Sequence, residues 1–215
     1  MKALNSLLGS VFLLAVSTAH AADFQRGLQE AQQGNYAAAL ADFKPLAEQG
    51  DASAQYDLAL MYANGYGVSQ DYAQAVTWYR KAAALGSIGA QTSLGVMYSG
   101  GIGVSQDYVQ AAEWYGKAAA LGDAGAKYNL GVMYYRGNGV AQSYAQAVAW
   151  FRKATAQGYD PAQYNLGIMY ENGQGVPKDH AQALALFRMA AAQGNADAKK
   201  ELFFLNADRN VLPQK

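Results

Sequence analysis

The sequence predicts an all-α protein folded as a solenoid, that is, a stack of similar helix pairs. The first observation behind this prediction is a motif, Gly-x-Gly-Val, that returns at a constant interval of 36 residues. It occupies residues 65–68, 101–104, 137–140 and 173–176. A constant interval of about 20–50 residues is typical of stacked arrays, in which no single repeat can bury its own apolar face.

The second observation is that the residues around the motif recur in the same register. One leucine, one tyrosine, one alanine and one glycine are kept in each repeat: Leu58, Leu94, Leu130 and Leu166; Tyr62, Tyr98, Tyr134 and Tyr170; Ala75, Ala111, Ala147 and Ala183; Gly86, Gly122, Gly158 and Gly194. This constant frame predicts the same two helices in every repeat.

The composition is that of a folded globular chain. Of its 215 residues 52% are hydrophobic, and 16 basic residues balance 16 acidic ones. No global field favours nucleic acid or an anionic membrane surface, so nucleic-acid binding is not expected. Because the sequence has no cysteine, it can form no disulfide and cannot carry a lipid on a cysteine after an export signal.

Residues 1–21 have the pattern of a secretory signal peptide. Lys2 precedes an apolar run, and Ala19-His20-Ala21 is a small-x-small cleavage site, which predicts cleavage after Ala21. The alternative is an uncleaved anchor, but the apolar run is short for a bilayer span of about 20 residues. We therefore expect a periplasmic protein, with secretion as the alternative, and no membrane insertion after cleavage.

Residues 22–50 are expected to form a shorter opening unit of two helices separated by Gly34. Gly27 takes the place that Ala59 has in the next unit. The distance from this small residue to the next framework alanine is four residues shorter, because the Gly-x-Gly-Val loop is missing.

Residues 51–194 are expected to hold four full repeats, with bounds at 51–86, 87–122, 123–158 and 159–194. The first helix of each repeat has apolar residues spaced i, i+4, i+7 and i+8, which is the buried stripe of an amphipathic helix. In the first repeat these residues are Ala54, Leu58, Met61 and Tyr62, and the second helix buries Ala75, Tyr79 and Ala82.

Short polar residues are expected to cap the helices, since their oxygens can accept bonds from the unpaired amides of the first turn. The expected caps of the first helices are Asp51, Ser87, Asp123 and Asp160, the last followed by Pro161 at the first helical position. Those of the second helices are Asp71, Asp107, Ser143 and Asp179. The first glycine of each motif is expected to end the first helix in a left-handed conformation.

The last segment, residues 195–210, is expected to be a capping helix that begins after Asn195, and residues 211–215 a short tail. Ala198, Leu202 and Leu205 continue the buried stripe, but no further Gly-x-Gly-Val follows. A terminal helix with a polar outer side would close the hydrophobic end of the stack.

These repeats resemble the Sel-one-like repeat family, which is related to tetratricopeptide repeats. The match is position by position in the second repeat, at Ala90, Leu94, Gly95, Tyr98, Gly101, Gly103, Val104, Ala111, Trp114, Tyr115, Ala118, Ala119 and Gly122. The resemblance implies a right-handed α/α superhelical solenoid whose concave surface holds proteins or peptides. Exported bacterial relatives include envelope-assembly scaffolds, signalling regulators, host-interaction factors and immunity proteins for secreted toxins.

Reactive chemistry has little support in the sequence. The glycine loops join helix to helix and lack the Gly-Lys-Ser/Thr ending of a phosphate loop. The histidine that remains after signal cleavage, His180, replaces a tyrosine of the other repeats, so no metal site, cofactor or catalytic residue is expected. The alternative is a cell-wall-active hydrolase, β-lactamase-like or peptidoglycan-acting, with Glu171 and Asp57 as an acid–base pair. Relatives described as β-lactamases are rich in cysteine, which this chain lacks.

A separate face of the first helices varies from repeat to repeat while the frame stays constant. It combines tyrosines, aliphatic residues and few charges, a composition typical of surfaces that hold proteins. The resemblance places this face in the concave groove. The candidate partner-binding residues are Tyr56, Leu60, Asn64, Thr92, Val96, Tyr128, Val132, Tyr135, Arg136, Tyr164, Ile168, Glu171 and Asn172. The alternative is that they are buried between neighbouring first helices.

The sequence therefore predicts a monomeric, non-catalytic module of the cell envelope that binds a protein or peptide partner and needs no cofactor. Within this class we expect an immunity protein for a secreted toxin, or an adaptor in envelope assembly or signalling.

Overall fold

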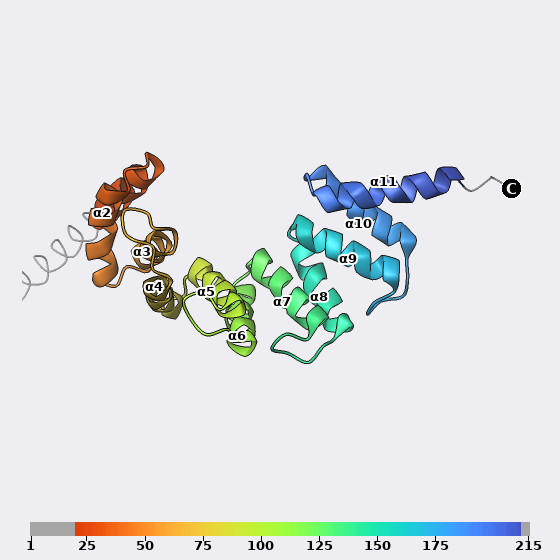
Figure 1. The fold of residues 1–215 in the computed structure, drawn as a ribbon, viewed down its shortest axis with the longest axis horizontal. Coiled ribbons are helices and arrows are strands. Elements are labelled where there is room, and N and C mark those ends of the chain that lie inside the picture. The colour runs from red at the N-terminus through yellow and green to blue at the C-terminus, as the bar shows by residue number, and fades with distance from the viewer. Residues whose placement is uncertain (1–19, 212–215) are drawn as a thin grey trace, which may run out of the picture. The chain divides into compact units, whose positions relative to one another are not determined.

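The computed structural model describes residues 20–211, and these form helices joined by turns and short loops, with no strand among them (Figure 1). Residues 1–19 of the expected signal peptide and residues 212–215 of the expected tail lie outside the described residues. After a first helix over residues 20–32, the helices are α2 (Tyr36–Glu48), α3 (Ala52–Asn64), α4 (Tyr72–Ala84), α5 (Ile88–Gly100), α6 (Tyr108–Ala120), α7 (Ala124–Arg136), α8 (Tyr144–Thr155), α9 (Asp160–Asn172), α10 (His180–Ala192) and α11 (Ala196–Val211).

The chain divides after Gln106 into two compact units. The described part of the first unit contains helix 20–32 and α2 to α5, and that of the second contains α6 to α11. Within each unit a helix packs on the next one along the chain, most extensively in the pairs α3–α4, α7–α8 and α9–α10. In Figure 1 these pairs appear as helical hairpins joined by long loops. The expected all-α repeat solenoid is confirmed.

The core of each hairpin consists of the two predicted stripes. On α7 the side chains of Ala126, Leu130 and Met133 are buried, and so are those of Ala147 and Phe151 on α8, the helix that packs on it. Burying one large aliphatic or aromatic side chain contributes about 1.5–3 kcal/mol.

Seven of the eight caps expected for the repeats accept a hydrogen bond from an amide in the first turn of their helix, as predicted. Asn195 does the same for α11. On α3, Asp51 Oδ1 accepts from the Ala54 amide at 2.7 Å, and on α4, Asp71 Oδ1 accepts from the Gln74 amide at 2.9 Å. The same bond is made by Ser87, Asp107, Asp123, Ser143, Asp179 and Asn195. Each such cap contributes about 1 kcal/mol.

The prediction that Asp160 caps α9 is wrong. The N-cap residue is Tyr159, which makes no side-chain cap bond, and Asp160 is the first residue of the helix. Tyr159 is the residue that lies one repeat of 36 residues after Asp123. Asp160 has a capping side chain, but it lies one position beyond the cap position of the repeat. Pro161 is accordingly the second helical residue. The Asp160 carboxylate instead accepts a bond from Asn195 Nδ2 at 3.0 Å, which links α9 to the start of α11.

The two glycines of each motif have different roles. The first one ends the helix as predicted: Gly137 has φ 75° and donates its amide to the Met133 carbonyl. The second one, Gly139, has φ 68° and lies against the start of the preceding hairpin's second helix. A Cβ added at Gly139 would lie 2.3 Å from the carbonyl carbon and oxygen of Tyr108. The loop is therefore a contact between neighbouring repeats as well as a turn.

At the end of the second unit, α11 covers the last hairpin. Ala198 is buried, and Leu202 and Leu205 pack against Phe187 and its neighbours on α10. Within residues 20–211 no helix is both long enough and apolar enough to cross a lipid bilayer.

Candidate partner-binding pocket

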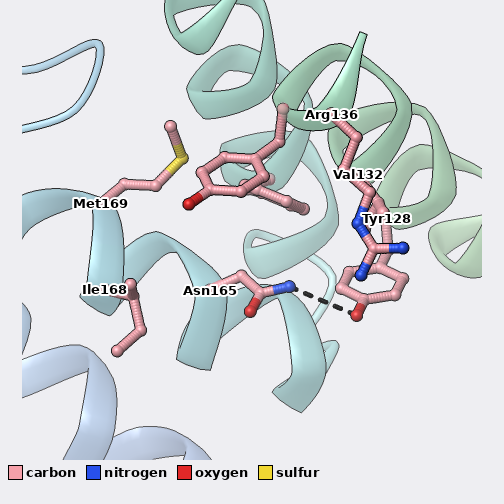
Figure 2. Close-up of a pocket in the computed structure, with 8 residues that line it drawn as sticks. Tyr128, Val132, Arg136, Asn165, Ile168 and Met169 are labelled. Carbon is pink, nitrogen blue, oxygen red and sulfur yellow. Dashed lines mark hydrogen bonds between the residues drawn. The ribbon is translucent and has the colours of Figure 1, made fainter. Parts of the chain in front are cut away.

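A cavity of about 250 Å³ lies in the second unit between α7, α8 and α9 (Figure 2). Its lining comes from three successive helices, so it exists only where two hairpins stack. The lining residues are Tyr128, Val132, Tyr135, Arg136, Phe151, Asn165, Ile168 and Met169. Five of these eight belong to the expected partner-binding face, namely Tyr128, Val132, Tyr135, Arg136 and Ile168.

The helical repeat brings these side chains together. Residues 128, 132, 135 and 136 lie one to two turns apart on the same side of α7, and residues 165, 168 and 169 share the facing side of α9. The buried ring of Phe151 on α8 completes the lining. The pocket thus follows from the spacing within two first helices and from the large residue in the second helix between them.

Tyr128 is fixed by aromatic contacts of its ring and by a hydrogen bond to its hydroxyl. Its ring centroid lies 5.8 Å from that of Phe151 and 5.4 Å from that of Tyr159. Its hydroxyl accepts a bond from Asn165 Nδ2 at 3.2 Å, the dashed line in Figure 2. Tyr128 therefore packs between repeats and also presents a polar edge to the cavity.

Tyr135 is fixed in a similar way by residues outside the cavity. Its ring lies 5.3 Å from that of Tyr144, and its hydroxyl donates to Gln174 Oε1 at 3.4 Å. Two aromatic walls of the pocket are therefore preorganised, which lowers the entropy that a bound partner must lose.

Arg136 is the cation of the pocket. It is the last residue of α7, its side chain is exposed, and no carboxylate within the described chain pairs with it. Val132 lies next to it on α7, and Ile168 and Met169 on α9 supply apolar surface on the other side of the pocket. The cavity can therefore accept an apolar group next to an anionic one.

The other residues of the expected face lie outside this pocket. Tyr56 packs its ring 5.7 Å from Tyr79, as Tyr164 does 5.8 Å from Phe187. Leu60 and Asn64 line a second cavity, in the first unit. Thr92 is partly buried with no bond to its hydroxyl, whereas Val96 is 43% exposed. The tyrosines thus pack between repeats and are also partly exposed. This lies between the two alternatives that the sequence allows, an open binding face and burial between first helices.

Glu171 and Asn172 lie at the end of α9. The Glu171 carboxylate is 2.8 Å from His180 Nδ1 and 3.8 Å from Lys178 Nζ, while Asn172 is exposed. His180 opens α10 as the tyrosines open the other second helices. Glu171 lies in the second unit and Asp57, its partner in the hydrolase alternative, in the first. Among residues 20–211 no three histidine or carboxylate side chains converge on one point.

Asn165, Met169 and Phe151 line the pocket but were not expected there. The stripe pattern had assigned Met169 and Phe151 to the core, where both are also buried. The sequence does contain a sign that Asn165 is special. Its position is polar in every repeat, where Asp57, Ser93 and Asn129 are the equivalent residues.

Several solved structures are similar to this chain, among them the following three. A protective antigen of uropathogenic Escherichia coli strains, which has an SLR fold, is 36% identical with a TM-score of 0.85 over 94% of this chain. This chain spans only 44% of that protein. A Sel1 repeat protein from Oxalobacter formigenes is 34% identical with a TM-score of 0.80, over 85% of this chain and 74% of the other.

The third structure is an immunity protein from Pseudomonas aeruginosa, 26% identical with a TM-score of 0.54 over 84% of this chain and 68% of the other. Among the curated proteins none matches the chain significantly. The family model for the Sel1 repeat matches it four times in succession, at residues 52–87, 88–123, 124–159 and 160–195. These matches cover most of the sequence, and the chain belongs to the Sel1 repeat family.

Proposed function

We propose that this protein is a non-catalytic interaction module that binds a polypeptide partner at the pocket between α7 and α9. The observation that carries the proposal is that a cavity with two preorganised aromatic walls also holds the guanidinium of Arg136, which pairs with no carboxylate among the described residues. A segment with an apolar side chain next to a carboxylate would satisfy both groups.

The size of the cavity favours a polypeptide over a small molecule. Sites for cofactors and drug-sized ligands usually enclose about 300–1,000 Å³, and this one encloses about 250 Å³. It can take one large side chain. Burying such a side chain contributes about 1.5–3 kcal/mol, and a charged hydrogen bond to Arg136 about the same. Because association itself costs at least about 4 kcal/mol, useful affinity requires further contacts along neighbouring first helices.

The setting we propose is the cell envelope. The export signal expected over residues 1–21 supports a periplasmic location, with secretion as the alternative, and a monomer free of the membrane once the signal is removed. The likeness to an immunity protein supports the specific role of neutralising a secreted toxin. A role as an adaptor in envelope assembly or signalling would use the same pocket.

The pocket is tested by charge reversal at its rim. Peptides selected from a displayed random library on the immobilised full chain should be enriched in acidic residues beside an aliphatic or aromatic one. We expect Arg136→Glu to weaken their binding more than about tenfold, since a charged hydrogen bond is replaced by repulsion. Arg188→Glu is the matched control, because Arg188 is exposed on α10 and lies outside the pocket.

Equal binding by wild type and Arg136→Glu would contradict the pocket assignment. The hydrolase alternative makes a different prediction, namely turnover of peptidoglycan or of a β-lactam by the purified chain and its loss in Glu171→Gln. Our proposal predicts no turnover of these substrates by the wild-type chain or by Glu171→Gln.

A further inference from the structure

The first unit contains another cavity, of about 380 Å³, between helix 20–32, α2, α3 and the loop after α3. Its lining residues are Leu28, Ala31, Gln32, Tyr36, Phe43, Asp57, Leu60, Met61, Asn64 and Tyr66. Most of this lining is apolar or aromatic. It includes one carboxylate, Asp57, and no lysine, arginine or histidine, so any charge in the cavity is negative.

The Asp57 carboxylate has no hydrogen bond or ion pair within the described residues. Asp42, a buried aspartate of the same unit, differs in having a partner. Asp42 is met by the guanidinium of Arg26, whose Nε lies 2.9 Å from Oδ2 and whose Nη2 bonds Oδ1. The half-buried Asp57 carboxylate therefore loses part of its hydration and gains no protein hydrogen bond in return, which is unfavourable.

The missing partner is explained by one substitution in the repeat. In the second unit the Tyr128 hydroxyl bonds Asn165, 37 residues later, and in the first unit Ser93 lies near the Tyr56 hydroxyl at the same spacing along the chain. Asp57 is the corresponding polar residue one repeat earlier, and the residue that should meet it is Phe24. A phenylalanine cannot donate a hydrogen bond.

The geometry supports this correspondence. The Phe24 ring lies 5.5 Å from that of Phe43, as the Tyr128 ring lies 5.8 Å from that of Phe151. Gly27 likewise lies against Phe43 as Gly131 lies against Phe151. Phe24 therefore takes the place of the tyrosine, without its hydroxyl.

The surroundings of Asp57 suit a planar cation. Tyr36 and Tyr66 stack with ring centroids 4.4 Å apart and form an aromatic wall of the cavity. Asn64 donates its amide to the Leu60 carbonyl of its own helix, which leaves its side-chain oxygen as an acceptor. The cavity thus presents acceptors and aromatic surface together.

We propose that this cavity binds an arginine side chain of the polypeptide partner, with its guanidinium on the Asp57 carboxylate and along the Tyr36–Tyr66 wall. The inference rests on the proposed function and names a second anchor of the same partner. Arginine fits better than lysine because its planar fork can bind a carboxylate through two hydrogen bonds and can stack on aromatic rings.

Asp57→Asn should stabilise the free protein in a pH-dependent way. Desolvation, and then the charge of Asp51, raise the pKa of Asp57 from 3.8 to about 6. The folded chain holds this proton more tightly than the unfolded chain, so stability falls as the pH rises through this window. We expect Asp57→Asn to raise the Tm by about 2–4 °C at about pH 7.5 and to leave it unchanged at about pH 4.

The ionisable groups around Asp57 do not alter this expectation. On α3 they are Asp51, which caps the helix, and Tyr56; α4 contributes Tyr79, and the cavity wall contributes Tyr36 and Tyr66. Burial raises the pKa of Tyr79 to about 12. Helix 20–32 contributes Leu28, Ala31 and Gln32 to the lining, and none of them ionises.

The direct test measures binding of blocked pentapeptides to the full chain by calorimetry or by NMR titration. The peptides are identical except for a central arginine, lysine or citrulline, the last being a neutral analogue of arginine. We expect the arginine peptide to bind at least about tenfold more tightly than the citrulline peptide, and Asp57→Asn to lose that advantage. Binding should weaken from about pH 7.5 to about pH 5 as Asp57 takes up its proton.

Glu48→Gln is the matched control, since it removes one exposed negative charge from the same unit and should leave the preference for arginine intact. Equal binding of the arginine and citrulline peptides, or undiminished binding by Asp57→Asn, would overturn the inference. Equal binding of the arginine and lysine peptides would overturn the assignment to arginine. If Arg136→Glu still weakens the selected peptides while Asp57→Asn leaves binding of the arginine pentapeptide unchanged, this inference fails and the proposed function stands.

Discussion

Replacing Gly139 by alanine is expected to destabilise the protein by about 3–5 kcal/mol, or about 10 °C in Tm for a chain of this size. Two effects add. Gly139 has φ 68°, and an L-residue in the left-handed region costs about 1–2 kcal/mol. The new Cβ would also lie 2.3 Å from the Tyr108 backbone carbonyl, and backbone cannot move aside as a flexible side chain could. Gly139→Val should destabilise the protein more than Gly139→Ala, because a β-branched residue resists positive φ more strongly.

Gly158→Ala separates the two effects. Gly158 has φ 80° but nothing within 4 Å of an added Cβ, so it carries the conformational cost alone. Thermal and urea denaturation of both variants should show a small loss for Gly158→Ala and a much larger one for Gly139→Ala. Equal losses would mean that the second glycine of the motif serves only the turn and that the loop is no contact between repeats.

Truncation of Phe187 to alanine is expected to destabilise the protein by a similar amount, about 3–5 kcal/mol. Phe187 is fully buried on α10, where it packs with Ala183, Ala190 and Ala198. Its loss leaves a cavity between the last hairpin and α11. Because a solenoid is stabilised by contacts between neighbouring repeats, the damage should be local.

Hydrogen exchange is the suitable measurement for this variant. Phe187→Ala should lose protection in α9, α10 and α11 before α3 and α4 are affected. Met189→Ala is the control on the same helix, since Met189 is 48% exposed and should cost less than about 0.5 kcal/mol. Uniform loss of protection along the whole chain would contradict the description as a stack of neighbours.

The helices and their ends could be predicted from the sequence because their signals are local. A cap such as Asp51 or a terminating glycine such as Gly137 acts within one or two turns, and the repeat interval shows each signal several times. The wrong cap at Asp160 arose where residue type was followed instead of that interval. Tyr159 has no capping side chain, and only the register identifies it.

Contacts between repeats were harder to predict because they join residues about one repeat apart. The sequence predicts the helix-ending role of the first glycine of each motif, but not the contact of the second one, Gly139, with the Tyr108 backbone. Tyr128 was expected on the binding face, and its hydroxyl also bonds Asn165. The exceptional environment of Asp57 depends on a phenylalanine in the preceding, shorter unit, and no pattern within its own repeat indicates it.

The central claim is that the protein acts by binding a partner at the pocket between α7 and α9, and not through a reactive side chain. The most direct test follows the methyl NMR signals of the full chain during titration with a selected peptide. We predict that the methyl groups of Val132 and Ile168 shift, while those of Val109, which is 54% exposed on α6, do not. Shifts at Val109 with none at Val132 and Ile168 would contradict the account.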